Sequence, residues 1–407
     1  MTTRFDGTRA LVIGGSVGGL TTALLLRDLG FDVTVFERTP QLLSDRGGGI
    51  VLQPDTLRWF AERSSRKPKD VSTATEFLRY LGERNEVLYE QAVEWRYSSW
   101  STLYRALYED FDPRQYVLGE YAAGFRQDES GVTVRFVSGR EERAELVVFA
   151  DGISSVGRQR LNPGAGKTYA GYIGWRGTVL ERELSKETAE LLNALTYSIG
   201  PSTQICMYPI PARNDALAGG ERLMNYVWYR NVAEGQELDE MMLDKQGITR
   251  PVSVTPGQVQ DRYVTQMKAD ASDLLAPAAA ELVQATAQPY IQALYDIRSE
   301  RVVCGRVALL GDASFASRPH AAAGTAKAAA DAWALAEALE SHDGDIVSAL
   351  ANWEPERLAL GNLLVDRVTE MGERSQFLNT WTPGDPSLDF GLYGPGVLTE
   401  PTKATTI

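Results

Sequence analysis

A glycine-rich turn near the N-terminus constrains the fold more than any other feature of the sequence. Residues 14–19 read GGSVGG and stand between a short apolar run at 10–13 and a stretch at 20–29 with helical spacing. An alternating run at 31–36 follows and ends in Glu37. This order predicts a strand, a turn, a helix and a second strand, the opening of a dinucleotide-binding α/β fold.

The residues of this turn suit a pyrophosphate. Gly14 and Gly19 allow a sharp bend and a close approach of the backbone, and the helix that follows offers free N–H donors. Ser16 replaces the second glycine of the usual G-x-G-x-x-G pattern, and its hydroxyl is able to donate to a phosphate. Glu37 follows Gly19 by 18 residues, where an acid accepts hydrogen bonds from ribose hydroxyls. We therefore predict that the turn binds a dinucleotide.

Composition narrows the classes of function. A chain of 407 residues is long enough for two or three domains, and 43% hydrophobic and 23% charged residues are typical of a globular protein. Acidic residues outnumber basic ones by 54 to 41, which argues against nucleic-acid or anionic-membrane partners. Two cysteines, Cys206 and Cys304, and two histidines exclude a disulfide scaffold and a Cys/His zinc site. We expect a cytoplasmic protein.

The pattern of elements changes along the chain. A hairpin is expected at 75–91, and aromatic strands without intervening helices occupy 167–274, which predicts an inserted, mostly antiparallel sheet. After residue 270 we expect helices and one buried strand at 307–310, and from residue 382 a loosely held tail rich in Pro, Gly and Thr. The predicted units are a discontinuous nucleotide-binding domain (1–74, 101–166 and 300–372), a substrate domain (75–100 and 167–299) and a C-terminal extension (373–407).

Two further motifs indicate which dinucleotide is bound. Residues 150–158 read ADGISSVGR after a predicted strand, and match D-G-x-x-S-x-x-R. Gly311 and Asp312 follow the strand at 307–310, and Pro319, Gly324 and Asp331 come after them. Together with the glycine turn, these motifs resemble those of the single-component FAD-dependent aromatic hydroxylases, the para-hydroxybenzoate hydroxylase-like family. The resemblance implies FAD in a Rossmann-like domain of the glutathione-reductase type, with C-terminal helices.

Longer stretches extend the resemblance over residues 9–391. They read GGGIVLQP, TYAGYIGWRG, YPIPAR, WYRNVAEG and RPHAAAGTAK, and are similar to those of family members that hydroxylate dihydroxypyridines. The resemblance implies an NADH- or NADPH-dependent monooxygenase that hydroxylates an electron-rich hydroxylated ring, such as a dihydroxypyridine, through a flavin C4a-hydroperoxide. It also implies a homodimer.

The resemblance assigns roles residue by residue. Gly14, Ser16, Gly19 and Glu37 would hold the ADP half of FAD, with Arg38 beside the adenine. Asp312 would bind the ribityl chain, and the stretch from Pro319 to Gly324 would lie along the isoalloxazine. Asp151 would act on the flavin side indirectly, with Arg158 steadying its turn, and Arg46 and Gly49 would border the phosphates and the flavin ring. Trp100 stands where the family often has a phosphate-binding arginine.

Candidates for the substrate site are fewer. His320 lies in the flavin loop, and an imidazole that titrates near neutral pH is able to accept a phenolic proton; the alternative is a structural histidine that caps a helix or packs beneath the flavin. Tyr208, Tyr226 and Trp228 are candidates to line the pocket, although most such aromatics are core residues. For Arg176, a surface or interdomain ion pair is favoured over an anionic ligand.

Other functions remain open at this point. Alternatives within the same fold are a flavin reductase, an epoxidase and a hydroxylase of another phenolic ring. A flavin-binding redox sensor is a less favoured alternative, because it would need an interaction domain or a basic face that the sequence does not offer.

Overall fold

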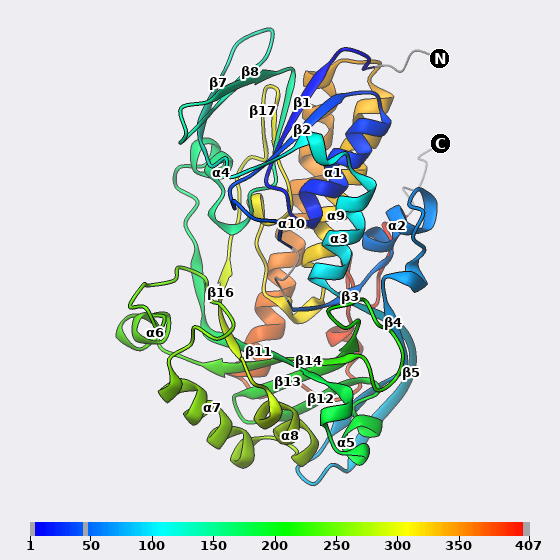
Figure 1. Ribbon diagram of the computed structural model, residues 1–407, viewed down its shortest axis with the longest axis vertical. Helices are drawn as coiled ribbons and strands as arrows, with labels where there is room; N and C mark the ends of the chain where they lie inside the picture. Colours follow the sequence, from blue (N-terminus) through cyan, green and yellow to red (C-terminus); the bar gives the residue numbers. More distant parts are fainter. Residues whose placement is uncertain (1–4, 44–47, 402–407) are drawn as a thin grey trace.

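The computed structural model describes residues 5–43 and 48–401. Figure 1 shows two main layers arranged along the long axis, a mostly parallel sheet with long helices and a large antiparallel sheet. The α/β fold class with a Rossmann-like domain is confirmed. The division into domains stays a prediction.

A six-stranded sheet, in the order β17-β18-β10-β1-β2-β6, forms the first layer, and all its pairs are parallel except β17–β18. Its central strands are continuous apolar runs, as expected where both faces of a parallel sheet are covered. The strands are β1 (Arg9–Ile13), β2 (Asp32–Glu37), β6 (Tyr116–Leu118), β10 (Leu146–Phe149), β17 (Val303–Cys304) and β18 (Val307–Leu309).

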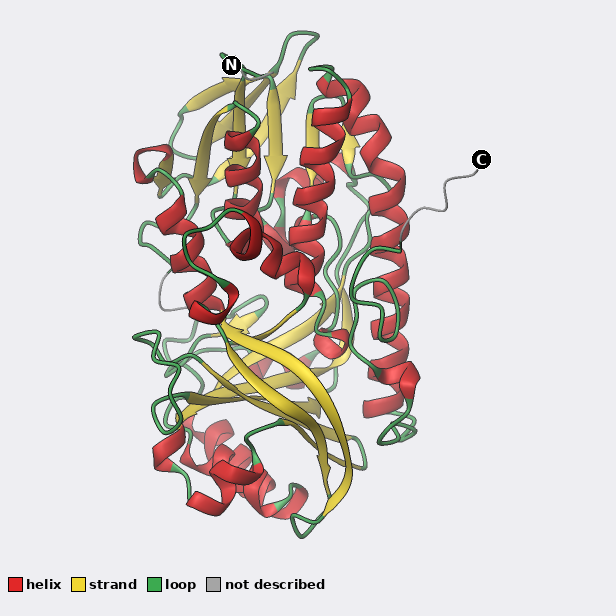
Figure 2. Ribbon diagram, turned by 90° about the vertical axis from the view of Figure 1, so that its right-hand side faces the viewer, coloured by secondary structure: helices red, strands yellow, loops and turns green. Residues whose placement is uncertain are grey.

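Helices cover this sheet (Figure 2). The alanine-rich helix α9 packs against α1, α2 and α10, because alanine side chains let helices approach closely. A small sheet of β7 (Ala122–Gln127), β8 (Val132–Phe136) and β9 (Glu141–Ala144) lies beside β1. The helices are α1 (Val17–Asp28), α2 (Pro54–Glu62), α3 (Trp100–Asp110), α4 (Val156–Leu161), α9 (Gly324–Ser341) and α10 (Ile346–Gln376).

The second layer is a nine-stranded sheet in the order β15-β16-β11-β14-β13-β12-β4-β5-β3, antiparallel except for β12–β4. Its strands are β3 (Gly49–Leu52), β4 (Thr73–Leu81), β5 (Val87–Ser99), β11 (Thr168–Leu180), β12 (Leu195–Gly200), β13 (Thr203–Ile210), β14 (Leu223–Asn231), β15 (Ser253–Val254) and β16 (Tyr290–Asp296). One face packs on α7 and α8, and the other faces α10 and the first layer. The remaining helices are α5 (Lys186–Leu191), α6 (Gln236–Met241), α7 (Asp261–Leu274) and α8 (Pro277–Ala285).

Several expectations about elements were wrong. Three helices, α5, α6 and α7, lie within 167–274, where strands without intervening helices were expected. β16 lies in the region after residue 270 that the sequence assigned to helices and one strand. The tail from residue 382 is not loosely held, because Leu388, Phe390 and Leu392 are all buried. Within the described ranges, no helix has the length and apolar character needed to cross a bilayer.

Candidate active site

The turn between β1 and α1 accepts only glycine at two positions. Gly14 has a φ of +107°, and a Cβ there would lie 2.4 Å from the carbonyl oxygen of Ala150. A Cβ on Gly19 would lie 1.9 Å from the carbonyl oxygen of Gly14. Glycine therefore lets the turn pack directly against the start of α1 and against the residues that follow β10.

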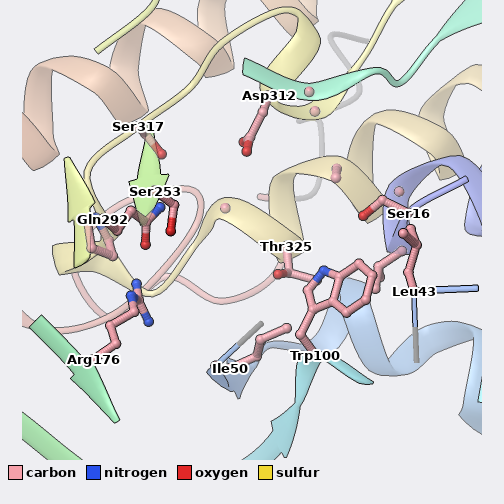
Figure 3. A pocket seen from close by; sticks show the side chains of 18 of the residues that line it. Ser16, Leu43, Ile50, Trp100, Arg176, Ser253, Gln292, Asp312, Ser317 and Thr325 are labelled. Carbon is pink, nitrogen blue, oxygen red and sulfur yellow. The ribbon is translucent and has the colours of Figure 1, made fainter. Parts of the chain in front are cut away.

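The N-terminus of α1 offers free donors. Its N-cap, Ser16, makes no side-chain cap, and the first turn carries no acidic side chain. The Ser16 hydroxyl lies at the cavity (Figure 3). Backbone N–H groups and the positive end of the helix dipole suit an anionic group such as a pyrophosphate.

Glu37 ends β2 as a buried carboxylate at the same cavity. Its Oε2 accepts from the N–H of Gly15 at 3.0 Å, and its Oε1 accepts from the N–H of Thr39 at 2.9 Å. Each carboxylate oxygen has a second acceptor position left for a ribose hydroxyl. Arg38 is exposed and lines the cavity beside it.

The two distant motifs meet through one arginine. The Arg158 guanidinium donates to the carbonyl oxygens of Ile153 at 2.5 Å and Ala313 at 3.0 Å, and so ties the 151–158 turn to the 311–313 turn. Asp151 accepts from the N–H of Val156 at 2.7 Å. This contact steadies the start of α4, and Asp151 also lines the cavity.

Asp312 points into the cavity (Figure 3). Enclosure by protein raises the pKa of its carboxyl, and the positive charges of Lys327 and Arg158 oppose that rise. Lys327 is itself buried: its Nζ lies 2.6 Å from Asp331 Oδ2, which also accepts from the N–H of Gly311 at 2.9 Å. The buried ion pair thereby holds the turn that presents Asp312.

One cavity of about 1090 Å³ connects these elements to the nine-stranded sheet. This exceeds the ~300–1,000 Å³ of most small-molecule sites, which leaves room for a dinucleotide and a small ring. We call the part lined by Gly14, Ser16, Glu37 and Asp312 the nucleotide end, and the part lined by Arg176, Tyr208, Tyr229, His320 and Trp381 the ring end.

The ring end uses one face of β13 and β14. Tyr208 and Tyr229 line the cavity, and both hydroxyls have a raised pKa because they are buried. Tyr226 and Trp228 do not line it, which corrects two of the predicted substrate residues. They point to the opposite face of β14, where they join the core formed with α7 and α8.

Arg176 also lies at the ring end, on β11 (Figure 3). Its guanidinium hydrogen-bonds the Tyr290 hydroxyl, and its Nε is buried without a partner. Among the described residues no carboxylate pairs with it, so the favoured expectation of a surface or interdomain ion pair was wrong. An unpaired guanidinium in a largely buried site favours an anionic ligand.

His320 is buried and joins a chain of polar contacts. Its Nε2 lies 2.7 Å from the Tyr172 hydroxyl, and the Arg318 guanidinium lies 5.5 Å from the centre of the Tyr172 ring. Burial and the positive charge of Arg318 lower the pKa of His320 to about 3, so the ring is neutral at physiological pH. The expectation that it titrates near neutral pH was therefore wrong.

The Tyr172–His320 hydrogen bond is compatible with either neutral tautomer of the imidazole. The Tyr172 hydroxyl donates to Nε2 when the imidazole hydrogen is on Nδ1, and it accepts from Nε2–H when the hydrogen is there. In both cases Nδ1 is buried and has no partner among the described residues. Tyr172 therefore holds one nitrogen of a neutral imidazole.

Comparison with known proteins places this geometry in a family. Residues 169–296 match the FAD binding domain-like family and residues 12–49 the NAD(P)-binding Rossmann-like domain. The chain is 38% identical over 389 residues to a 2,6-dihydroxypyridine 3-monooxygenase of Paenarthrobacter nicotinovorans, covering 94% of this chain and 96% of that one. The chain belongs to the FAD-dependent aromatic hydroxylases.

Solved structures agree with the membership. The structure of 2,6-dihydroxypyridine-3-hydroxylase from Arthrobacter nicotinovorans superimposes with a TM-score of 0.90 and 36% identity, covering 97% of this chain and 98% of that one. A Klebsiella pneumoniae protein crystallised with FAD and uric acid shares the fold, with a TM-score of 0.74 and 22% identity over 92% of this chain and 90% of that one. The predicted family, the monooxygenase class and the FAD cofactor are confirmed.

Most of the predicted site residues line the cavity. They are Gly14, Ser16, Glu37, Arg38, Gly49, Asp151, Tyr208, Asp312, Pro319, His320 and Gly324. Gly19 does not line it but permits the turn, and Arg46 lies outside the described residues. Gly49 has a packing role too, since a Cβ there would lie 2.6 Å from the Asn225 side chain.

The residues present fit FAD. The uncapped helix start and the glycine turn suit a pyrophosphate. Glu37 offers an acceptor for a ribose, and the Asp312 carboxylate offers one for a ribityl chain. Trp100, in place of an arginine, presents its indole to the cavity near Thr325 (Figure 3). At that position no guanidinium is present to contact a phosphate.

Proposed function

We propose that this hydroxylase acts on a hydroxylated pyridine, with 2,6-dihydroxypyridine as the first candidate. One atom of O₂ enters a ring C–H bond to give C–OH, and the other is reduced to water. Two electrons come from NADH or NADPH, and one further proton completes the water. Support comes from the dihydroxypyridine monooxygenase that is 38% identical over nearly the whole chain.

Unpaired polar groups at the ring end carry the proposal. Arg176 Nε, Gln204 Nε2 and His320 Nδ1 have no hydrogen-bond partner among the described residues. All three residues line the cavity, together with the aromatic rings of Tyr208 and Tyr229. A dihydroxypyridine that has lost a proton offers two oxygen acceptors and a ring nitrogen along one edge, which suits a wall of polar groups that would otherwise be costly to bury.

Different residues would bind the cofactor and the substrate. FAD would be held by Gly14, Ser16, Glu37, Arg38 and Asp312, and its ring would lie along Pro319 and Gly324. Bound FAD supplies the transfer of electrons from the nicotinamide and the activation of oxygen. The aromatic walls exclude water and orient the substrate, and Arg176 stabilises the ring as an anion, the form that is richer in electrons.

His320 would act as a neutral hydrogen-bonding group on the substrate. The low pKa, about 3, makes it a poor acceptor for a full proton. When its hydrogen is on Nδ1, the imidazole is suited to donate to a ring oxygen or nitrogen while Tyr172 holds it in place. In this role His320 fixes the position of the ring rather than deprotonating it.

We also propose a cytoplasmic homodimer. Both Cys206 and Cys304 are free thiols, as expected in a reducing compartment. The dimer follows from the family resemblance. Sedimentation of the FAD-loaded protein at several concentrations would test it, and a monomer at every concentration would contradict it.

The function is tested by oxidation of NADH and of NADPH by the FAD-loaded protein, with and without 2,6-dihydroxypyridine. We expect the ring to stimulate oxidation and to appear as a product one oxygen atom heavier, with little hydrogen peroxide. Stimulation with hydrogen peroxide as the sole product would contradict this substrate and direct the search to another phenolic or heteroaromatic ring.

A further inference from the structure

The C-terminal segment, which we define as residues 377–397, is built into the ring end of the cavity. Trp381 and Phe390 both line the cavity and are 7% exposed. The segment is rich in proline and glycine, and has only one short 3₁₀ turn, at Pro386–Leu388. The side chains of Trp381 and Phe390 are therefore held by tertiary contacts rather than by regular secondary structure.

Those contacts place both rings beside the groups that would meet the substrate. The Trp381 ring lies 6.1 Å from the Tyr197 ring and 6.0 Å from His320, measured between centroids. The Phe390 ring lies 6.5 Å from that of Tyr197 and 5.5 Å from that of Trp95. The two residues thus extend the aromatic wall of the ring end from β5 and β12 to the flavin loop.

Polar contacts fix the segment in this position. The Trp381 indole N–H donates to the Tyr80 hydroxyl at 3.2 Å, and Arg374 pairs with Asp385 at 2.5 Å. Arg367 donates to the carbonyl oxygen of Gly391 at 2.5 Å. These anchors come from β4 and α10, so both the nine-stranded sheet and the long C-terminal helix hold the segment.

The segment also contacts the loop that carries His320. The N–H of Gly391 donates to the carbonyl oxygen of Ala321 at 3.4 Å, and the same oxygen accepts from Gln53 Nε2 at 3.3 Å. The next residue, Ala322, has a φ of +53°, a backbone conformation that residues other than glycine rarely adopt. The hydrogen bond from the segment therefore helps to hold the left-handed backbone of the loop that carries His320.

We propose that Trp381 and Phe390 contact the substrate and determine which rings this hydroxylase accepts. They limit the ring end to a single six-membered ring and exclude water from it, so that oxygen transfer is favoured over release of hydrogen peroxide. This inference rests on the proposed function, because it assumes that the ring end holds the substrate.

The test compares Trp381→Ala and Phe390→Ala with Leu378→Ala, a matched control in the same segment whose side chain is 61% exposed. Trp381→Phe and Phe390→Leu serve as milder variants if the alanine variants do not fold. The dissociation constants of FAD and of 2,6-dihydroxypyridine are measured by fluorescence and difference spectra without oxygen, and hydroxylated product and hydrogen peroxide are then counted per NAD(P)H oxidised.

For the Trp381 and Phe390 variants we expect unchanged FAD affinity, a hydrogen peroxide fraction roughly threefold or more above wild type, and new binding of a bicyclic dihydroxyquinoline. The Leu378 variant should behave as wild type. Wild-type coupling and an unchanged range of rings in all four variants would overturn the inference. If the wild-type protein binds 2,6-dihydroxypyridine without hydroxylating it, the result contradicts the proposed function instead. In that case the dissociation constants of 2,6-dihydroxypyridine and dihydroxyquinoline still decide the role of the segment.

Discussion

The nucleotide end and the ring end of the cavity are built from different parts of the polypeptide. At the nucleotide end the contacts come from backbone N–H groups, glycines without side chains, and two acids that follow strands of the parallel sheet. At the ring end they come from side chains on β11, β13, β14, the flavin loop and the C-terminal segment. Cofactor binding is therefore a property of the backbone path, whereas substrate choice is a property of side chains.

This difference matters for how each end responds to change. A site built mainly from the backbone is lost when the path of the chain is blocked, and apart from Glu37 and Asp312 its side chains contribute little. At a site built from side chains, each substitution changes substrate binding by a limited amount, because each side chain contributes its own hydrogen bond, charge or surface. Substitutions at the two ends should consequently affect different measurements.

The largest effect is expected for Gly19→Ala at the nucleotide end. The added Cβ would lie 1.9 Å from the carbonyl oxygen of Gly14, and backbone on both sides leaves no flexible group to move aside. We expect the turn to shift and the dissociation constant of FAD, measured by fluorescence titration of the apoprotein, to rise by about 100-fold.

Gly164→Ala is the matched control, since a Cβ at Gly164 meets nothing within 4 Å. It should bind FAD as the wild type does. Wild-type affinity in Gly19→Ala would show that the nucleotide end does not depend on the path of the turn, and the contrast between the two ends would fail.

Arg176→Met should affect the ring end alone. It keeps the length of the side chain and removes the charge that we expect to face an anionic ring. Loss of a charge-assisted hydrogen bond lowers kcat/KM for dihydroxypyridine by about 10- to 100-fold, with FAD affinity unchanged. Arg176→Lys should recover part of the loss, because it restores the charge without the planar fork.

The exposed Arg182 provides the control, as Arg182→Met removes a charge outside the cavity. It should leave both FAD affinity and kcat/KM unchanged. If Arg176→Met loses FAD as well as activity, then Arg176 supports the cofactor, and the division between the two ends is less sharp than the geometry indicates.

The same difference explains what the sequence predicted. Gly14, Ser16, Glu37, Asp312 and the family itself were predictable, because a backbone-built site leaves short local motifs at the ends of strands. The ring end leaves no such motif. Its residues come from strands far apart in the sequence, and their contributions depend on which face of each strand looks into the cavity.

Tyr226 and Trp228 show why that face was not predictable. Alternation along β14 places them on the face opposite Tyr229, but both faces of the nine-stranded sheet are covered, one by α7 and α8 and the other by α10. Hydrophobicity therefore does not distinguish the core face from the cavity face. The C-terminal segment was misjudged for a related reason, since its Pro, Gly and Thr content masked the burial of Trp381 and Phe390.

A smaller effect is expected on the pH dependence of stability through His320. Its pKa is lowered to about 3 in the folded protein, so between about pH 6.5 and 3 the unfolded chain binds a proton that the folded chain does not. The contribution of His320 to stability is therefore complete above pH 6.5 and falls as the pH falls. Between pH 7 and pH 5 the free energy of unfolding should drop by about 2 kcal/mol from this group alone.

Urea denaturation of the FAD-loaded protein at the two pH values measures that drop. His320→Gln should lack this part of the pH dependence, whereas replacement of the second histidine, in His342→Gln, should retain it. Equal pH dependence in wild type and His320→Gln would mean that the ring end admits the charged imidazole, contrary to the neutral ring described above.

The smallest and most discriminating effect should come from one hydroxyl group on each face of the same sheet. Tyr208 lies at the cavity and Tyr226 on the opposite face, and burial raises the pKa of both hydroxyls. Tyr208→Phe should raise KM for dihydroxypyridine by about fivefold, the value of one neutral hydrogen bond. The Tyr226 hydroxyl is buried without a hydrogen-bond partner among the described residues, so Tyr226→Phe should leave KM within about twofold and change the free energy of unfolding by less than about 1 kcal/mol. A direct contact with the substrate is possible for Tyr208 and not for Tyr226, because only Tyr208 lies at the cavity. An equal rise of KM in both variants would therefore mean that the hydroxyls act through the packing of the sheet rather than on the substrate.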